Sequence, residues 1–415
     1  MYSRADAVEG GGAARTSPRK KCLLVMTREF RNGDVATGRE RVVSFIKETI
    51  AANAALIVFR VPCLIGEGTV LDWTRALLQW LRRLAIGRPM PFQVMLFSNR
   101  RRMRELLRCI ETHAPDTVYF DGARCVDYLR YVRRHRPTLH LVCDLDDLMS
   151  RRMKMLYESR MGISLGYLSK VVPGWLRGQL YGAIGRLVAR YEFATLRVAE
   201  RQVVEAVDAC VLLSSRDAEL LREEVPHRLR ERVISIPPAQ EIRRRVCIAA
   251  GPLRFVFIGT DALTQNRLTI EWLIELWRVR RPAATLHIYG NMQHVYKPPE
   301  NVRFEGFAES LDTVYTVDSI LIAPAFLGGG IKTKIVEAIA NGVIVVANES
   351  AFEGLGFEAG GLKFDEQTIG EIVSAPASYL SGLAAAAEAV QKRCEQYLNP
   401  RTVSERWLDV LRLKS

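Results

Sequence analysis

Short apolar segments rich in β-branched residues alternate along this chain with longer segments of helical periodicity. The alternation is typical of parallel β-α-β units, because strands that are buried on both faces read as continuous apolar runs. In the first half of the chain we expect strands at 22–26, 55–61, 117–120, 139–143, 209–213 and 233–236. In the second half we expect strands at 254–258, 285–289, 302–304, 319–323 and 343–347, with helices such as 268–278 and 332–341 between them.

The two series of strands predict two consecutive α/β domains, each a Rossmann-like, doubly wound parallel sheet, facing each other across a cleft. We expect a disordered leader at 1–20, an N-terminal domain at 21–240 and a charged linker at 241–251. A C-terminal domain at 252–392 and a final helical segment at 393–415, able to pack back on the N-terminal domain, complete the chain. Ligands of such sheets bind beyond the carboxyl ends of the strands, which predicts a site in the cleft.

Charge is distributed unevenly between the halves. Residues 1–250 hold 43 Lys and Arg against 27 Asp and Glu, whereas residues 251–415 hold 16 against 19. A basic half suits docking on an anionic surface such as a membrane leaflet, although an ordinary solvated basic surface remains an alternative. The basic helical insertion at 148–191, which carries tyrosines and a tryptophan, is the first candidate for that contact, and the alternative is a helix packed on its domain. Trp73 and Trp80, followed by arginines, are the second candidate for contact with a membrane.

The eight cysteines are scattered singly, without the spacing of a zinc site or a disulfide framework, which favours a reducing, cytoplasmic compartment. No apolar segment reaches the roughly 18 residues of a membrane-spanning helix. We therefore expect a cytoplasmic protein, peripheral at the inner face of the plasma membrane if it contacts a bilayer. Motifs of nucleic-acid recognition are absent, so nucleic acid is not an expected partner.

The sharpest chemical signal is the segment 320–342, ILIAPAFLGGGIKTKIVEAIANG. A buried strand ends before a triple-glycine turn, and a helix begins near Ile331. Consecutive glycines let backbone amides approach an anion, and the start of a helix adds partial positive charge. Lys332 and Lys334 in the first turn are unfavourable there unless a negative ligand is present. Glu337, further along the helix, can accept the hydroxyls of a ribose. The alternative is a glycine-rich loop with a solvated helix.

The segment 328–355 resembles the nucleotide-sugar site of retaining glycosyltransferases of the GT-B fold, in the large family that contains glycogen-synthase-like enzymes and mannosyltransferases. The segment 255–277 resembles the opening strand and helix of that family's donor domain, and 287–291 and 302–309 resemble the next two strand-end loops. In the first half, 142–153 and 191–217 resemble bacterial polysaccharide glycosyltransferases, although more loosely.

This resemblance implies specific roles. Glu337 would bind the ribose, and Arg267 or Lys332 would offset the charge of the leaving group. The turn and the following helix would hold the diphosphate through Gly328, Gly329, Gly330, Lys332 and Thr333. The loops that begin at Gly290 and Phe304 would frame the base, and the glycine loop with Gly33 and Gly38 would approach the phosphates from the other domain. The family often has two glutamates in the donor segment, and Gly329 stands in place of the first.

The cluster of Asp144, Asp146 and Asp147 follows a strand of the first domain. We interpret Asp144 and Asp146 as lining the acceptor side, where they could capture the proton of an attacking hydroxyl. A helix N-terminal acid set is the alternative. Fixed amides, a helix terminus and cations are able to stabilise the departing diphosphate, so neither a metal nor a cofactor is required beyond the nucleotide diphosphate sugar itself.

The sequence therefore predicts a glycosyltransferase, retaining by resemblance and independent of metal. It would move a hexose-type sugar to a lipid-linked or polysaccharide acceptor in cell-surface glycan synthesis. Two other functions stay open. A sugar-nucleotide epimerase shares the two-domain fold but should place histidines together for proton transfer, and the six histidines here form no evident cluster. The other is a non-catalytic binding protein with the same fold.

Overall fold

The computed structural model describes residues 19–27, 38–158, 183–247 and 252–414. Nearly all of the expected leader, Gly33, the middle of the basic insertion and the end of the linker lie outside the described residues. Each strand expected from the hydrophobic pattern is present, and its ends agree with the expected ones to within three residues. No described helix combines the length and the apolar character needed to cross a membrane.

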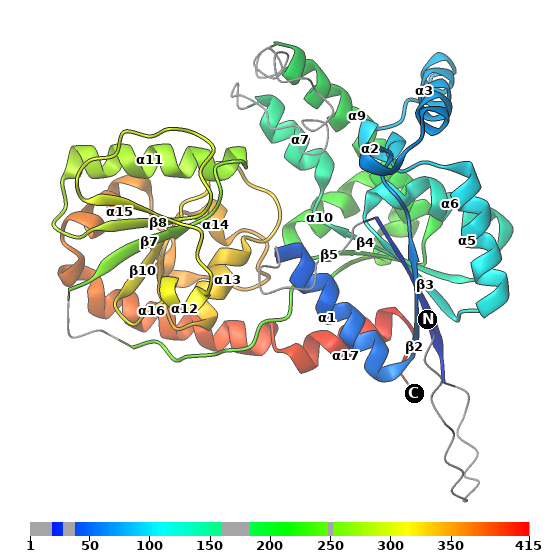
Figure 1. Cartoon of the computed structure of the whole chain (residues 1–415). Helices are drawn as coiled ribbons and strands as arrows, with labels where there is room; N and C mark the ends of the chain where they lie inside the picture. The colour runs from blue at the N-terminus through cyan, green and yellow to red at the C-terminus, as the bar shows by residue number, and fades with distance from the viewer. Residues whose placement is uncertain (1–18, 28–37, 159–182, 248–251, 415) are drawn as a thin grey trace, which may run out of the picture.

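The N-terminal domain contains a six-stranded parallel sheet with the strand order β2-β1-β3-β4-β5-β6 (Figure 1). Helices connect the parallel strands, as the alternating pattern predicts. The strands are β1 Lys21–Met26, β2 Ala55–Arg60, β3 Thr117–Asp121, β4 His140–Asp146, β5 Ala209–Leu212 and β6 Val233–Ser235. The α-helices described here are α1 Gly38–Asn53, α2 Leu64–Glu67, α3 Val70–Ala85, α4 Phe92–Met95, α5 Arg100–His113, α6 Val126–His135, α7 Met149–Glu158, α9 Ala183–Ala206 and α10 Ser215–Glu224.

Alternate residues of β1 enter different cores on the two faces of this sheet, because successive side chains of a strand point in opposite directions. Cys22 and Leu24 pack with α1 and with the last helix of the chain. Leu23 and Val25 pack on the opposite face with residues of α5, α6 and α9. All four side chains are fully buried, so this sheet has helices on both faces and no solvated side.

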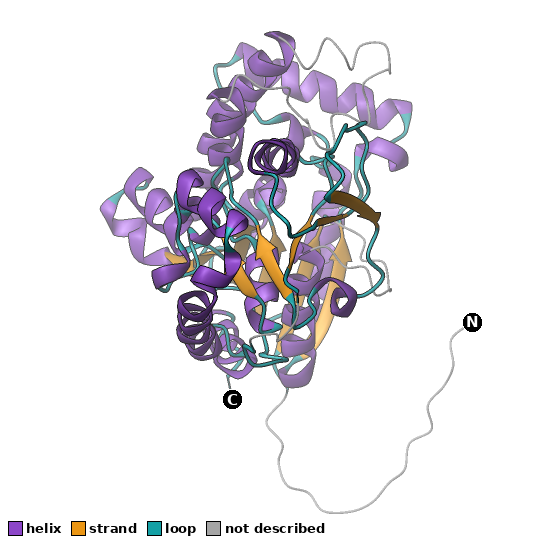
Figure 2. Cartoon of the chain, turned by 90° about the vertical axis from the view of Figure 1, so that its left-hand side faces the viewer, coloured by secondary structure: helices purple, strands orange, loops and turns teal. Residues whose placement is uncertain are grey.

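The C-terminal domain repeats this architecture around a five-stranded parallel sheet with the order β11-β10-β7-β8-β9. Figure 2 views the molecule from the side of this domain and shows helices on both sides of the strands. The strands are β7 Arg254–Ile258, β8 Leu286–Tyr289, β9 Val302–Gly306, β10 Ser319–Ile322 and β11 Ile344–Val346. Its helices are α11 Thr264–Arg280, α12 Leu311–Val314, α13 Thr333–Ala340, α14 Glu349–Phe352, α15 Glu366–Ser374 and α16 Pro376–Tyr397. The last helix of the chain, α17 Pro400–Val410, packs on the N-terminal domain.

The chain crosses between the domains twice, at the linker and again between α16 and α17 (Figure 1). The two crossings lie side by side, and the amide of Gln240 donates to the carbonyl of Leu398 at 2.7 Å. The C-terminal core extends to Leu398, so the boundary expected at 392 falls inside α16, a helix that continues until the Asn399-Pro400 step. Beyond it, Trp407 of α17 is buried against the N-terminal sheet and contacts Tyr119.

Both sheets contain a switch point, where the helical connections diverge to opposite sides. In the first sheet it lies between β1 and β3, and in the second between β7 and β10. Such a point leaves a crevice at the carboxyl ends of the strands, where ligands of these folds bind. We therefore expect the loops after β1, β7 and β10 to form the ligand-binding site.

Candidate functional site

The triple-glycine turn joins β10 to α13. Gly329 and Gly330 have φ angles of +90° and +63°, a region in which other residues are strained, so the turn depends on glycine at these two positions. Helix α13 begins at Thr333, and its N-cap residue, Lys332, makes no side-chain cap hydrogen bond. The start of the helix therefore keeps amide groups available at the end of the turn.

A second helix start meets the first across the domains. Gly38, the first residue of α1, lies so close to Thr333 that a Cβ atom at position 38 would come within 2.7 Å of its Cγ2. The positive ends of two helices, one from each domain, therefore converge at this contact. Converging helix starts favour a negatively charged ligand between them.

Glu337, one turn into α13, faces the other domain. Its side chain is 11% exposed and forms an ion pair with Arg41 of α1. Burial raises the pKa of Glu337, and the charges of Arg41 and Lys334 only partly offset that effect. The glutamate expected to bind a ribose is thus turned toward the gap between the domains, next to the meeting point of the two helix starts.

Lys334 is half-buried at the carboxyl end of β7. Its Nζ donates to Oδ1 of Asn266 at 2.8 Å and lies 4.2 Å from the centre of the Phe257 ring. The same nitrogen approaches the backbone at Gly259, where a Cβ atom would be 3.0 Å away. Burial lowers the pKa of Lys334 to about 7, because its nearest partners are a neutral amide and an aromatic face.

Lys332 folds back over the glycine turn. Its Nζ donates to the carbonyl oxygens of Gly329, at 2.6 Å, and Gly330, at 3.3 Å. Burial lowers the pKa of this lysine to about 8. Two lysines with lowered pKa values thus stand at the start of one helix, where the helix dipole also disfavours cations. An anion bound at this point would relieve both effects.

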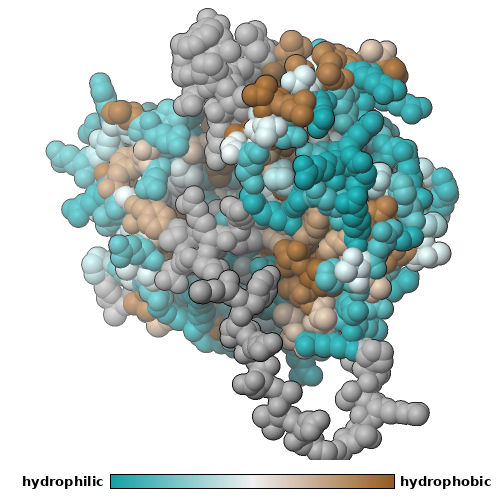
Figure 3. All heavy atoms as spheres, turned by 45° about the vertical axis from the view of Figure 1, so that its right-hand side comes forward, coloured by the Kyte–Doolittle hydropathy of each residue, from teal (hydrophilic) through white to brown (hydrophobic). Residues whose placement is uncertain are grey.

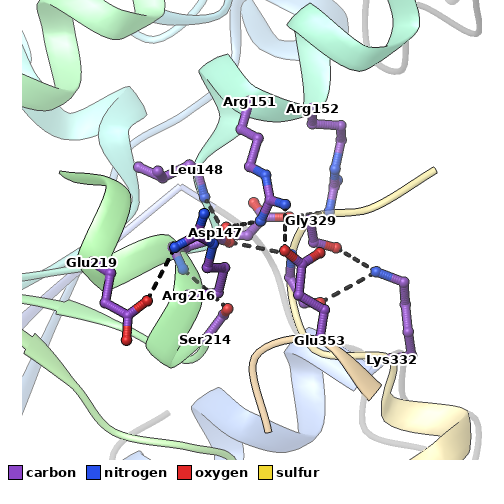
Figure 4. A network of polar contacts seen from close by, with 12 residues as sticks. Asp147, Leu148, Arg151, Arg152, Ser214, Arg216, Glu219, Gly329, Lys332 and Glu353 are labelled. Carbon is purple, nitrogen blue, oxygen red and sulfur yellow. Dashed lines mark hydrogen bonds and ion pairs between the residues drawn. The ribbon is translucent and has the colours of Figure 1, made fainter. Parts of the chain in front are cut away.

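A network of ion pairs and hydrogen bonds joins the other side of the turn to the N-terminal domain (Figure 4). Asp217 of α10 accepts from the amide of Gly330 at 3.2 Å and from Arg151 at 2.7 Å. Arg151 of α7 also donates to Glu353 of the C-terminal domain at 2.5 Å. Gly354 is in close contact with Ser214, the N-cap of α10. The amide of Gly330 is therefore already hydrogen-bonded to the carboxylate of Asp217.

A groove of about 1150 Å³ runs beside this network, between the domains. Arg151 and Arg216 line it from the N-terminal domain, whereas Gly328 and Glu353 line it from the C-terminal domain. The groove places open space directly against the first glycine of the turn. It is large enough for sugar units, and both domains contribute polar groups to it.

Glycines at the ends of β7, β8 and β9 bring three loops close together. A Cβ atom at Gly290 would come within 2.5 Å of the carbonyl oxygen of Gly259, and the amide of Gly290 donates to Gly306 at 2.7 Å. Asp261, which is 2% exposed, accepts from the amides of Gln293 and His294 and so fixes the loop after β8. Burial opposes its ionisation, but these hydrogen bonds outweigh burial and lower its pKa.

The acidic cluster after β4 divides into a buried and an open part. Asp144 is fully buried, where it accepts from Arg39 at 2.8 Å and from the hydroxyl of Tyr119 at 2.7 Å. Arg39 also pairs with Asp121 at 2.5 Å and lies 3.6 Å from Asp146. Burial raises the pKa of Asp144. Both of its oxygens are engaged inside the domain, since the amide of Asp146 binds the other one.

Asp146 is the more accessible of the two predicted catalytic carboxylates. Its side chain is 27% exposed, and its φ of +70° turns the backbone sharply at the end of β4. The following residue, Asp147, lies against the glycine turn and pairs with Arg152 of α7. The structure thus brings the loop after β4 to the interdomain gap, but it separates Asp144 from that gap.

Arg267 makes no hydrogen bond or ion pair with the turn among the residues that the structure describes. Its nearest carboxylate is Glu271 at 3.6 Å, on the same helix, and its charge acts on Tyr296. Gly33 lies outside the described residues. Sequence reasoning assigned no role to Arg41, Asn266 or Asp217. Arg41 follows the expected glycine loop directly, in GRERVV, and that position was the only available signal.

Comparisons with known proteins relate the C-terminal domain to a family and the whole chain to a fold. Residues 252–380 match the family model described as glycosyl transferases group 1. No curated protein matches the sequence. Among solved structures, HepE from Anabaena in complex with UDP and glucose has a TM-score of 0.58 and 12% identity, over 95% of this chain and 99% of that one.

Two further structures are similar over almost their whole length. Sucrose-phosphate synthase from Thermosynechococcus elongatus has a TM-score of 0.58 and 14% identity, covering 95% of this chain and 98% of that one. The lipopolysaccharide outer core galactosyltransferase WaaB has a TM-score of 0.57 and 11% identity, with 94% and 98% covered. At these identities, the likeness shows a shared fold.

Proposed function

We propose that this chain, a group 1 glycosyltransferase of the GT-B fold, transfers a hexose-type sugar from a nucleotide diphosphate sugar to a lipid-linked or polysaccharide acceptor in cell-surface glycan synthesis. The observation that carries the proposal is the meeting of α1 and α13 at Gly38 and Thr333, with Glu337 turned into the same gap. A diphosphate between the two helix starts would have its ribose beside this glutamate.

The donor is held by four kinds of group. The helix starts and the amides of the turn bind the phosphate oxygens, and Lys334 and Lys332 supply cations. Glu337 accepts hydrogen bonds from the ribose hydroxyls in place of its pair with Arg41. The loops fixed by Asp261 and Gly290 frame the base. HepE was solved with UDP-glucose, which makes UDP-glucose the first donor to test.

Charge stabilisation on the leaving group supplies the catalysis. When the bond between the sugar and the diphosphate breaks, negative charge grows on the terminal phosphate. Fixed amides and a buried lysine stabilise such charge more strongly than water does, because they need no reorganisation. The same groups make a divalent cation unnecessary. Asp146, exposed at the end of β4, is the carboxylate proposed to receive the acceptor's proton.

The acceptor reaches the groove from the N-terminal domain. The basic character of that half suits an acceptor attached to anionic lipid, and the protein would act as a peripheral enzyme at the cytoplasmic face of a membrane. WaaB, of similar fold, is a lipopolysaccharide galactosyltransferase, which supports a glycan acceptor. Retention of configuration follows from the family resemblance and is tested by the anomeric signals of the product.

The test measures donor hydrolysis and transfer with a panel of labelled nucleotide sugars, in the presence and absence of EDTA. We expect one sugar nucleotide to be cleaved, to give either transfer or slow hydrolysis, and EDTA to have no effect. Glu337→Gln should abolish cleavage. Glu388→Gln is the matched control, because Glu388 lies in the same domain, exposed on α16 and away from the groove. Full activity of Glu337→Gln, or an epimerised donor as the only product, would contradict the proposal.

A further inference from the structure

Helix α3 of the N-terminal domain exposes a row of large apolar side chains. Its other side packs on the domain through Trp73 and Trp80, which face inward and are therefore not the exposed surface that the sequence suggested. Nε1 of Trp80 donates to the hydroxyl of Tyr191 at 2.9 Å, and its ring stacks on Phe92. The exposed side chains, each 45–61% accessible, are Leu71, Leu77, Leu78, Leu81, Leu84 and, just past the helix end, Ile86.

Such a row is unusual on a water-exposed helix. Single exposed leucines are normal, but several neighbouring ones along one helix mark a surface that binds a protein or a membrane. Thr69 and Asp72 cap the start of α3 with a reciprocal pair of hydrogen bonds. The helix is therefore a defined element of the fold, presenting its leucines on a fixed support.

An arginine-rich groove of about 830 Å³ lies along one flank of this helix, between α3, α5 and α6. Only one acid, Asp127, lines it, and that carboxylate is already bound by Arg83 at 2.8 Å and by Ser98. Burial lowers the pKa of Arg130, and the neighbouring charges of Arg134 and Arg83 lower it further. The arginines that line the groove are Arg82, Arg83, Arg88, Arg100, Arg104, Arg130 and Arg134.

Most of this charge is uncompensated. Within the described part of the chain, no carboxylate lies within ion-pair distance of Arg82, Arg88, Arg100, Arg104 or Arg134. A second groove of about 440 Å³ adjoins the first along α3, shares Arg82, Arg100 and Arg104 with it, and adds Arg75 and Arg101. The leucine row is thus bordered by guanidinium groups along the side that faces the two grooves. Figure 3 shows apolar side chains gathered near the top of the molecule, with hydrophilic ones beneath them.

We propose that α3 and its flanking grooves dock the protein on an anionic phospholipid bilayer. The leucines enter the acyl region, and the arginines bind lipid phosphates at the level of the headgroups. Neither a nucleic acid nor a soluble polyanion would use the leucines, whereas a bilayer uses both parts of the surface.

The position of α3 relates this surface to the active site. Helix α3 follows the carboxyl end of β2, and α1 and α7 follow the carboxyl ends of β1 and β4 at the same edge of the sheet. In Figure 1, α3 and α7 project from the same side of the N-terminal domain. Docking therefore turns the acceptor side of the site toward the membrane. The link between docking and delivery of the acceptor rests on the proposed function. Binding to vesicles can be measured without any sugar transfer.

The experiment is co-sedimentation of the full chain with vesicles of phosphatidylcholine, alone or with 30% phosphatidylglycerol. We expect binding to the anionic vesicles that weakens as salt rises. Arg100→Gln with Arg104→Gln should reduce the partition coefficient about thirty-fold. Leu78→Ser with Leu81→Ser should reduce it at least about ten-fold. Arg228→Gln with Arg230→Gln, elsewhere on the same domain, and Val279→Ser with Val317→Ser, exposed in the other domain, are the matched controls and should bind like the unmodified chain.

Folding and donor binding are checked on each variant by thermal unfolding with and without UDP, which separates failure of docking from failure of the proposed function. Binding that is equal on neutral and anionic vesicles, or unaffected by either pair of substitutions, would overturn the inference. So would a dimer of the unmodified chain that Leu78→Ser with Leu81→Ser dissociates, since the leucines would then face a second copy.

Discussion

Arg41 and Glu337 form an ion pair that joins α1 of the N-terminal domain to α13 of the C-terminal domain. The carboxylate is largely buried, whereas the arginine side chain is 47% exposed. A ligand entering from the gap can therefore displace the arginine and leave the glutamate in place. In this arrangement Arg41 favours the ionised form of Glu337 until the donor arrives, and the ribose hydroxyls then donate hydrogen bonds to the carboxylate in its place.

Removal of Arg41 should make donor binding sensitive to acid. Burial already raises the pKa of Glu337, and Arg41 opposes that rise, so Arg41→Met raises the pKa further. The ribose requires the ionised carboxylate, and UDP affinity is lost as pH falls through this pKa. We expect the acid limb of UDP binding to move upward by about 1 pH unit. Isothermal titration calorimetry with UDP between pH 4.5 and 8 measures this shift. An unshifted acid limb in Arg41→Met would count against the role of the ion pair between Arg41 and Glu337.

Lys334 should take up a proton when the diphosphate binds. Its pKa in the free protein is about 7, because burial lowers it, and a bound phosphate should raise it again. Above pH 7 the free lysine is mostly neutral, so binding requires proton uptake, and affinity falls as pH rises until the pKa of the complex is passed. Titration of UDP at pH 8 in buffers of different ionisation enthalpy measures this uptake. We expect roughly one proton per site, and none in Lys334→Met.

Lys334 should also lower the free energy of unfolding of the ligand-free protein. Its folded-state pKa lies below the unfolded value, so the folded chain binds fewer protons between about pH 7 and 10 and gains stability across that window as pH rises. At pH 7, Lys334→Met removes a buried cation and should raise stability by on the order of 1 kcal/mol while UDP no longer shifts Tm. Lys392→Met, at an exposed position, is the control. A lower Tm for Lys334→Met without ligand would refute this prediction.

Gly38 should set how closely the two helix starts approach. A Cβ atom there would lie 2.7 Å from Cγ2 of Thr333, so the side chain of Gly38→Val must displace Thr333, and we expect the two helix starts to move apart. We expect a loss of UDP affinity of about a hundred-fold, because the diphosphate would no longer contact both helix starts together. Each domain should stay folded, as circular dichroism would show. Gly38→Val with Thr333→Gly restores space and should recover part of the affinity.

Much of the fold was predictable because buried parallel strands and their connecting helices depend on local pattern. The strand at 254–258 and the turn at 328–330 follow directly from apolar runs and consecutive glycines. Contacts between distant segments were not predictable in this way. Arg41 meets Glu337 only because α1 and α13 start at the same gap, and no spacing in the sequence records that meeting.

Faces of helices were a second source of error. Helix α3 has one polar side and one wide apolar side that holds both its tryptophans and its leucines, so its pattern does not tell which apolar residues are buried. In the structure the tryptophans pack inward and the leucines face solvent. Asp144 and Asp146 have the same spacing as a pair of catalytic carboxylates, yet Arg39 and Tyr119 enclose the first inside the sheet. Burial decides such cases, and burial is a property of the assembled domain.

Asp144 and Asp146 should separate cleanly by their effects on stability and catalysis. Asp144→Asn leaves Arg39 buried with one fewer anionic partner, and loss of one member of a buried ion pair costs about 3–5 kcal/mol. Its Tm should fall sharply, while turnover of the protein that remains folded at low temperature changes only a few-fold.

Asp146→Asn should show the opposite result. Asparagine tolerates the left-handed backbone at this position, so Tm is retained, but the exposed carboxylate that receives the acceptor's proton is lost and kcat falls about a hundred-fold. Thermal unfolding and initial rates at one temperature measure both variants. Should Asp144→Asn keep its Tm and lose its rate, the buried residue would be the catalytic one, and the arrangement of the acceptor side would have to be reversed.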